Sequence, residues 1–461
     1  MSVSRCREGR RIAGLVFFLG LGLGSGPLMA GDSPTYHRDV ARILQKNCQE
    51  CHRPGQVAPF SLLDYEQARK RADDIVDVTE ERTMPPWHAS TTEGGPFRGA
   101  RVLSDRDRKV LSDWADAGAP EGDSKDAPPP VSWPSDWAMG TPDLVLKVNQ
   151  PFELGASGPD EYRVFVLPSG LTEGRWIAAA DFRPGNRKVV HHILAAYDTT
   201  GNARKLDAAD PLSGYASSGG GYGRLPSGFP FLPAGQLWGW APGRRVFQAP
   251  EGMARALPAG ADVLLQVHYH KSGKPESDAS EIGLYFARGP VDKQIRSAIV
   301  MPPRTGLLGK PKLHIPAGEA KHEVRGSRTI QQDSHLLAVF PHMHLLGRDF
   351  LLTAVRPDGS RQVLIRINDW DFNWQNPYEF VRPVPLPRGT KVELVAHFDN
   401  SAANPNNPSR PPKDVNWGEE TTDEMCIGFM QVTMDSEHLG GQSPDSIRKP
   451  VRDQRRNALE D

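Results

Sequence analysis

The sequence has few cysteines, no excess of charge and, beyond its first residues, no long apolar run. Four cysteines in 461 residues are too few for a disulfide scaffold. The 55 basic and 56 acidic residues give a formal net charge of -1, so no basic surface indicates a nucleic-acid partner. After the N-terminus, no stretch reaches the ~20 apolar residues that a bilayer span requires. The composition therefore favours a non-membrane protein stabilised by burial and bound metal.

The N-terminal segment has the pattern of a signal peptide. A group of arginines precedes an apolar run at residues 12–24, and small residues lead to Ala30 as the cleavage point. We expect residues 1–30 to be removed on export, which places the protein in the periplasm or outside the cell without a permanent membrane anchor. The alternative is that the segment is retained as an anchor. In either case Cys6 belongs to this segment.

The remaining chain changes character at a proline-rich stretch near residue 130. The preceding region has helical spacing, and Ser104 predicts the cap of a last helix that ends near Trp114. The following region has short apolar runs between turn residues, as the 45 glycines and 42 prolines suggest. We predict a multidomain protein, with a small all-α domain followed by two all-β sandwich (jelly-roll-like) domains. The predicted segments are an all-α domain at 31–125, a linker at 126–140, sandwiches at 141–300 and 301–436, and a mobile tail at 437–461.

The all-α region carries a haem-attachment motif at Cys48-Gln-Glu-Cys51-His52. Two thiols at this spacing can each bond a haem vinyl group, and His52 is then an axial ligand of the iron. A zinc site would need a second ligand pair, and a thioredoxin-type pair would need a βαβ context. Neither is present in this region. One covalent haem c is therefore predicted.

The sixth iron ligand is predicted to be Met84, in the segment Arg82-Thr-Met-Pro-Pro-Trp87. The prolines end the preceding helix, and a thioether ligand suits electron transfer because it raises the reduction potential. The alternatives are His88, His37 or an open position. The order of helix, CxxCH motif and MPPW segment resembles small bacterial class I cytochrome c domains over about ninety residues.

Three histidine pairs lie on apolar strand-like runs in the second part of the chain. They are His191 and His192, His268 and His270, and His342 and His344. Residues i and i+2 of a strand share a face, so His342 and His344 can bind one metal ion together. Adjacent residues point to opposite faces, so His191 and His192 can share an ion only at a strand end or a bulge. A single such histidine is more often structural, but three pairs favour metal binding.

Met425 distinguishes between the possible metals. Imidazole suits both copper and zinc, whereas a thioether selects copper(I). Met425 opens the apolar run at the end of Thr421-Thr-Asp-Glu-Met-Cys426. Methionine and the absence of an accompanying general-base carboxylate disfavour a zinc hydrolase.

The ordered segments VHHILAAYD, LLQVHYH, PHMHLLG and TTDEMC resemble the copper type II, ascorbate-dependent monooxygenases over roughly residues 140–435. This family includes the peptidylglycine α-hydroxylating and dopamine β-monooxygenases. The resemblance implies two β-sandwich domains with one copper ion each. It implies that His191, His192 and His268 hold an electron-storing copper, and that His342, His344 and Met425 hold the catalytic copper that binds oxygen. His270 is an alternative to His268, or a neighbour that supports it.

Two features depart from that family. The animal enzymes are rich in disulfides, including one at the cysteine of DEMC, whereas Cys426 has no expected partner here. The cytochrome-like region offers a one-electron donor on the same chain, in the place where the animal enzymes use ascorbate.

The sequence therefore predicts an exported copper monooxygenase that hydroxylates a C–H bond with O2. Its electrons would come from an external periplasmic donor through its own haem. The substrate is expected to be a small organic molecule or a peptide. The aromatic residues Trp370, Phe372, Trp374 and Tyr378 could line a pocket, although burial statistics favour a place in the core. The alternative is a periplasmic haem and copper electron-transfer protein without oxygenase activity.

Overall fold

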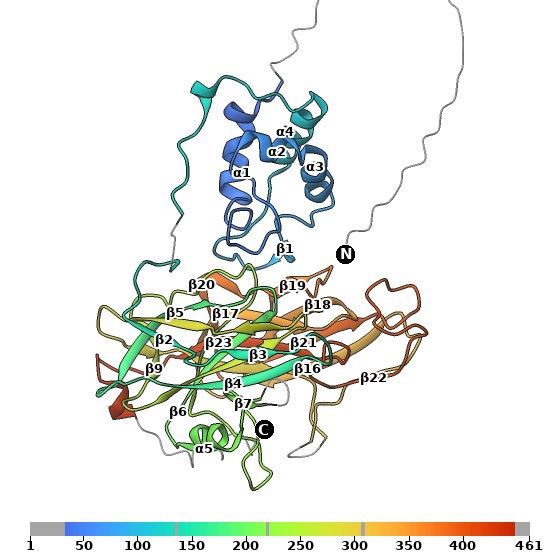
Figure 1. Cartoon of the computed structure of the whole chain (residues 1–461). Helices are drawn as coiled ribbons and strands as arrows, with labels where there is room; N and C mark the ends of the chain where they lie inside the picture. Colours follow the sequence, from blue (N-terminus) through green and yellow to red (C-terminus); the bar gives the residue numbers. More distant parts are fainter. Residues whose placement is uncertain (1–32, 134–136, 218–220, 306–308, 448–461) are drawn as a thin grey trace, which may run out of the picture.

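The computed structural model describes residues 33–133, 137–217, 221–305 and 309–447, and the predicted signal peptide lies outside these ranges. The described chain is mostly β-sheet, with most of its helices gathered on one side (Figure 1). No helix in these ranges is both long and apolar enough to cross a membrane.

The helices at the start of the chain enclose a small core of their own. They are η1 (Tyr36–Val40), α1 (Ala41–Asn47), α2 (Tyr65–Arg69), α3 (Ala72–Glu80) and α4 (Asp105–Asp116). Helix α5 (Asn202–Ala209) comes much later in the chain. Trp114 and Leu111 of α4 are fully buried against Leu44 of α1 and its neighbours. Ser104 caps α4 as predicted, because its hydroxyl accepts a hydrogen bond of 3.0 Å from the amide of Asp107.

The first β-sandwich consists of two five-stranded sheets, in the orders β7-β4-β10-β6-β8 and β13-β9-β5-β12-β2, with the pair β11-β3 beside them. Its strands are β2 (Leu144–Lys147), β3 (Phe152–Leu154), β4 (Glu161–Pro168), β5 (Arg175–Arg183), β6 (Val190–Asp198), β7 (Tyr215–Ala216), β8 (Gly235–Trp240), β9 (Met253–Leu257), β10 (Asp262–Tyr269), β11 (Glu276–Asp278), β12 (Glu281–Phe286) and β13 (Lys293–Gln294). Alternate residues such as Ile193, Leu265 and Ile282 fill the space between the sheets.

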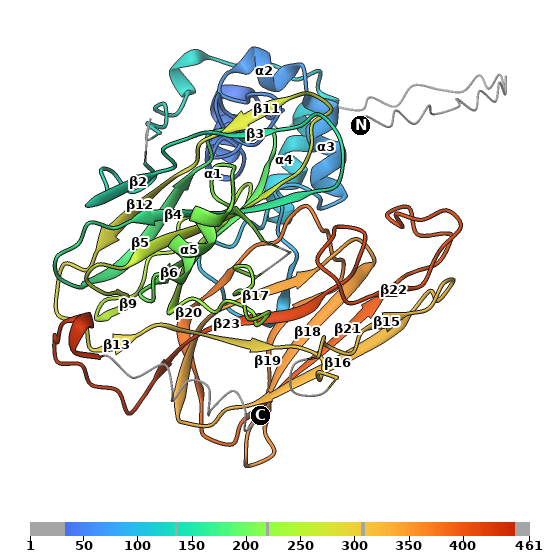
Figure 2. The same ribbon diagram turned by 60° about the horizontal axis from the view of Figure 1, so that its bottom comes forward.

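The second sandwich packs the sheet β1-β19-β18-β21-β16 on the sheet β14-β23-β17-β20, and β15 pairs with β22 at one end (Figure 2). Its strands are β1 (Ala89–Gly94), β14 (Arg296–Val300), β15 (His314–Ile315), β16 (His322–Thr329), β17 (Ser334–Met343), β18 (Gly347–Val355), β19 (Arg361–Ile367), β20 (Tyr378–Leu386), β21 (Lys391–Phe398), β22 (Val415–Asn416) and β23 (Cys426–Met434). β14 belongs to this sandwich, which therefore begins before residue 301.

Strand β17 borders both sandwich cores. Leu336 and Val339 pack in the second core, whereas Leu337 and Ala338 pack in the first. The register of β17 against β20 and β23 shifts between Leu336 and Ala338, which reverses the alternation of inward and outward residues. After this bulge, the even-numbered residues of β17 point away from the second core.

The helical region is joined to the second sandwich by a strand that the helical spacing did not predict. β1 pairs with β19, and the ring of Phe97 then packs at a tilt against Tyr378 and Phe380, with ring centroids 5.3 and 5.1 Å away. Residues 89–97 therefore belong to the β-structure. This segment is short and mostly polar, so the sequence gave no strand signal, and its partner strand lies far away in the sequence.

The predicted mobile tail is in part firmly packed, which corrects that expectation. Glu437 pairs with Arg296 at 2.6 Å, and Leu439 is buried beside Val291. Asp445 accepts a hydrogen bond from the amide of Ala259 at 2.8 Å. The polar composition was misleading, because these polar groups bind the two sandwiches instead of water. The predicted linker also contains a packed residue, since Trp137 is buried against Tyr285.

Replacing Phe97 with alanine is expected to lower the free energy of unfolding by roughly 3–5 kcal/mol, because it leaves a cavity between Tyr378, Phe380 and Trp87. Urea unfolding followed by tryptophan fluorescence measures the change. The control Val102→Ala, at a side chain 44% exposed, should change it by less than about 0.5 kcal/mol. Equal effects of the two variants would contradict this packing.

Candidate metal centres

His191, His192 and His268 form a compact group on the first sandwich. One ring nitrogen from each lies within 4.8 Å of those of the other two. His268 of β10 stands directly opposite His192 of β6, and the register then skips from His268–His192 to Tyr269–Val190. His191 is the extra residue of this bulge, so adjacent histidines reach the same side of the sheet. The bulge resolves the geometric conflict that the adjacent histidines presented in the sequence.

The Nδ1 atoms of this group face one another. His192 Nδ1 lies 3.2 Å from His191 Nδ1 and 3.4 Å from His268 Nδ1. The other nitrogen of His268, Nε2, lies 2.8 Å from a carboxylate oxygen of Asp160, and the Tyr162 ring stacks on His268 at 4.1 Å. These two contacts fix the ring of His268 with Nδ1 turned toward the group.

His270 is not a member of this group. Its side chain is exposed, and its Nδ1 lies 2.9 Å from the second carboxylate oxygen of Asp160. Asp160 also accepts a hydrogen bond of 3.1 Å from the hydroxyl of Thr421, which precedes Met425 in the second sandwich. Burial alone would raise the pKa of Asp160, but hydrogen bonds from His268, His270 and Thr421 outweigh it and the pKa lies below its usual range. Asp160 is therefore an anion that links the two sandwiches.

His342, His344 and Met425 lie on one face of the second sandwich. The rings of His342 and His344 are 5.1 Å apart. The register of β17 and β23 pairs His342 with Ile427 and Met343 with Cys426. Extending this register by one step sets Met425 opposite His344, and the amides of both residues donate to the same carboxylate oxygen of Glu424. The three predicted ligands thus lie at the same end of β17 and β23.

In the second group Nδ1, and not Nε2 as in His268, contacts the protein. Nδ1 of His344 lies 3.0 Å from the carbonyl oxygen of Asp423, and Nδ1 of His342 is bound to the side-chain oxygen of Gln375. A ring nitrogen that donates to the protein leaves the other as the metal-binding atom, so Nε2 is the candidate ligand atom in both residues.

Glu424 fixes the backbone around this second group. Its buried carboxyl accepts hydrogen bonds from the amides of His344 at 2.8 Å and Leu346 at 2.6 Å. Burial raises the pKa of Glu424 to about 8, although three amide hydrogen bonds oppose that rise. The turn after β17 is therefore bound directly to the segment that carries Met425.

Phe372 lies between the two histidine groups. Its ring stacks on His191 at 5.4 Å with an angle of 16° and meets His344 edge-on at 5.9 Å. The hydroxyl of Tyr162 also donates to the carbonyl of Glu419 at 2.9 Å, across the same junction. The two groups consequently face one junction between the sandwiches, separated by an aromatic ring.

The imidazoles are held in the neutral form that binds metal ions. Burial lowers the pKa of His191 and His344 to about 4 and that of His342 to about 3. Burial also places the pKa of His192 well below its ordinary value, and the neighbouring imidazoles lower it further. At neutral pH these rings keep a lone pair for a metal ion.

The donor sets fit copper. Three imidazole nitrogens form the first set, and two imidazoles with a thioether form the second. Thioether sulfur is a soft ligand that selects copper(I) and is poorly suited to zinc.

The CxxCH motif follows α1, and both thiols are free and partly buried. The ring of His52 packs on Phe60 at 4.6 Å, and its Nδ1 is buried without a hydrogen-bond partner. A free cysteine pair beside an unsatisfied imidazole fits an attached haem, which remains a prediction.

Met84 follows α3 with its side chain half-buried, and its amide bonds the carbonyl of Val78 at 3.0 Å. The two alternative iron ligands have other contacts. His37 faces Glu121 at 3.4 Å, and His88 hydrogen-bonds the backbone of Asp369 in the second sandwich. The axial role of Met84 stays a prediction.

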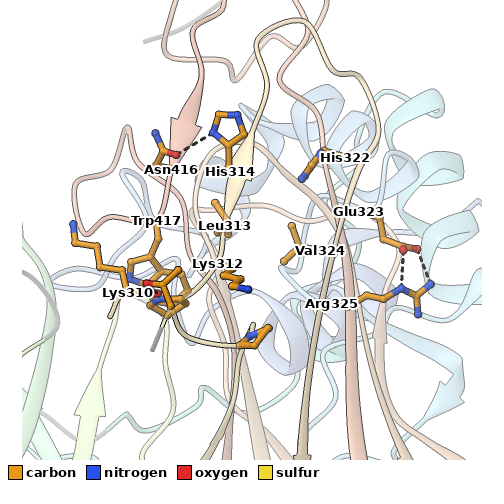
Figure 3. Close-up of a pocket in the computed structure, with 13 residues that line it drawn as sticks. Lys310, Lys312, Leu313, His314, His322, Glu323, Val324, Arg325, Asn416 and Trp417 are labelled. Carbon is orange, nitrogen blue, oxygen red and sulfur yellow. Dashed lines mark hydrogen bonds and ion pairs between the residues drawn. The ribbon is translucent and has the colours of Figure 1, made fainter. Parts of the chain in front are cut away.

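A cavity of about 630 Å³ lies elsewhere, between β15, β16 and β22 (Figure 3). Its wall includes His314, which bonds Asn416, and Glu323, which bonds Arg325. None of the histidines or methionines predicted to bind metal lines it.

The sequence gave no signal for Asp160 and Gln375, which act through tertiary contacts with histidine side chains. Glu424 was visible inside the TTDEMC segment, but its contact with the backbone of His344 was not. Phe372 was noted only as a possible pocket or core residue.

Residues 304–436 match the sequence model of the family "Copper type II ascorbate-dependent monooxygenase, C-terminal domain". The chain is also 24% identical over 263 residues to the human (Homo sapiens) "DBH-like monooxygenase protein 1", and 22% identical over 260 residues to the chicken (Gallus gallus) protein of that name. Each match covers 53% of this chain and 39% of the relative. These matches support the copper type II monooxygenase family and imply copper.

Among solved structures, the chain is similar to "PNGF-II" with a TM-score of 0.26 and 9% identity, over 66% of this chain and 67% of that one. It is also similar to the VP2 subviral particle of infectious bursal disease virus, with a TM-score of 0.19 and 9% identity over 66% and 73% of the two chains. Scores this low give no information on function.

Replacing Asp160 with asparagine should weaken copper binding by the three-histidine group about 10–100-fold, because the variant loses the anion that orients His268. Copper titration against a competing chelator measures the affinity. The matched control Asp358→Asn, at an exposed turn, should bind copper as the unchanged protein does. Unaltered affinity in the Asp160 variant would show that the carboxylate does not support the group.

Proposed function

We propose that the protein is an exported copper-dependent monooxygenase that hydroxylates a C–H bond with O2 and receives its electrons through a c-type haem on the same chain. The observation that carries this proposal is the meeting of the three-histidine group and the His342, His344 and Met425 group at one junction between two sandwiches. The family match over residues 304–436 supports the same chemistry.

The two groups have different tasks in this proposal. His191, His192 and His268 hold the electron-storing copper, and His342, His344 and Met425 hold the copper at which oxygen is used. Copper bound there supplies a one-electron redox centre and a binding position for O2. Hydroxylation with O2 consumes two electrons and two protons; a Cu(I) ion in the second group would supply one of these electrons, and the copper of the three-histidine group would store and deliver the other.

The surrounding residues hold the ligands in place before a metal ion binds. Asp160 and Tyr162 fix the His268 ring, while Gln375 and the Asp423 carbonyl turn His342 and His344 so that Nε2 is free. The glutamate that follows Asp423 holds the turn after β17. Side chains that are already oriented lose less conformational entropy when a metal ion binds.

Cys48, Cys51 and His52 hold the haem in this proposal, with Met84 as the second axial ligand. An external periplasmic donor reduces the haem, and the substrate is a small organic molecule or a peptide. Because donor and acceptor share one chain, the effective concentration of the haem region at the copper centres is high.

Replacing Met425 with isoleucine should abolish oxygen-dependent turnover and leave the haem spectrum unchanged, because isoleucine has similar bulk but no sulfur ligand. Oxygen consumption by the reduced protein with candidate substrates, recorded with an oxygen electrode, provides the measurement. Met434→Ile, on the same strand β23, is the matched control and should keep its activity. Turnover that survives in the Met425 variant would refute the assigned oxygen site.

Metal analysis of protein matured with haem should find two copper ions and one haem per chain. His268→Ala and His342→Ala should each remove one copper ion, because each residue belongs to only one group. Zinc in the second group would refute the monooxygenase proposal. Full copper and haem loading without O2 consumption would instead favour an electron-transfer protein.

A further inference from the structure

One loop of the second sandwich contacts both Gly243 of the first sandwich and the two histidine groups. It spans residues 368–377 between β19 and β20 and contains the aromatic residues Trp370, Phe372 and Trp374. The indole nitrogen of Trp370 donates to the carbonyl of His344 at 3.1 Å, and Trp370 itself is buried. We call this segment the aromatic loop.

At the helical side, the CxxCH motif is bound to the β-structure by its own acidic residue. Both carboxylate oxygens of Glu50 lie 2.9 Å from Nε of Arg245, and Arg245 also contacts the carbonyl of Gly99 at 3.3 Å. A second guanidinium, from Arg101, lies 3.4 Å from Glu50. Glu50, which lies between the two motif cysteines, is thus ion-paired to the first sandwich.

The next contact leads from this ion pair to the aromatic loop. Arg101 donates to the carbonyl oxygen of Gly243 at 3.1 Å. Gly243 has φ of +73° and packs so closely that a Cβ there would lie 3.0 Å from the Trp374 ring. Only glycine combines this backbone conformation with this approach. Trp374 therefore packs directly on the residue that Arg101 holds.

The last contacts lead from the aromatic loop to the histidines. The amide of Trp374 bonds the carbonyl of Asp371 at 3.1 Å, and Gln375 donates to the carbonyl of Phe372 at 3.1 Å. The oxygen of the same Gln375 side chain is bound to His342. Phe372 contacts His191 and His344, as described above. Packed atoms thus connect the motif to both groups.

We propose that the aromatic loop is the electron bridge between the c-type haem and the two copper centres, with Trp374 at the haem side and Phe372 at the copper side. This inference rests on the proposed function. In each electron transfer, ferrous haem is oxidised to ferric haem and one Cu(II) is reduced to Cu(I), so one electron moves and no bond breaks. Electron tunnelling weakens steeply across gaps, and this loop offers continuous packing with aromatic side chains at both ends.

The test uses the full chain with ferric haem and Cu(II), reduced under anaerobic conditions with less than one electron per chain by pulse radiolysis. In the unchanged protein, haem absorbance should show ferrous haem that is reoxidised at a rate independent of protein concentration. Trp374→Leu and Phe372→Leu should slow this phase about tenfold or more, a barrier increase of roughly 1.4 kcal/mol. Trp374→Phe should restore most of the rate.

The matched control is Trp176→Leu, which removes another half-buried indole, at the far contact with Gln442. It should transfer electrons at the unchanged rate. Haem potential, haem spectrum and the electron paramagnetic resonance spectrum of Cu(II) should be the same in all variants, which separates a bridge from a structural role. Unchanged rates in both aromatic-loop variants would overturn the bridge alone. Absence of intramolecular reoxidation in the unchanged protein would overturn the bridge together with the proposed haem supply.

Discussion

The arrangement of both histidine groups depends on the packing of β17 between two cores. The strand contributes Leu336 and Val339 to one core and Leu337 and Ala338 to the other. That is possible only because a bulge reverses its alternation between these residues. Without the reversal, His342 and His344 would point into the second core, where unpaired imidazoles are costly. The same bulge turns them toward the first sandwich and its own three histidines.

A second bulge, in β6 of the first sandwich, also turns histidine side chains toward the junction. It lets His191 and His192 share a side, while Asp160 fixes the opposed His268. Each of His268, His342 and His344 has one ring nitrogen bound to the protein and the other left toward its group. The free nitrogen is Nδ1 in His268 of the first group and Nε2 in both histidines of the second. Hydrogen bonds, more than strand position, decide which nitrogen of these rings meets a metal ion.

The sequence predicted the strands and most of the candidate ligands because both follow local rules. The strand-like segment VHHILAAYD coincides with β6, and LLQVHYH lies in β10 up to its last histidine. The i and i+2 spacing of His342 and His344 specifies a shared face directly. Contacts between distant segments were not predictable in this way. The carboxylate of Asp160 reaches His268 across 108 positions of sequence, and no periodicity marks such a partner.

Because contacts between distant segments leave no local pattern, the helical region was expected to be a separate unit on a linker. Its composition is helical, yet β1 adds to the sheet of the second sandwich and Glu50 pairs with two arginines. A flexible tether raises only the effective concentration of two partners, which must still find the correct orientation in each encounter. A strand in a shared sheet fixes that orientation once, when the chain folds. The entropic cost of orienting the two partners is then part of the free energy of folding. The position of the CxxCH motif relative to the aromatic loop is therefore a property of the folded chain, not of a transient encounter.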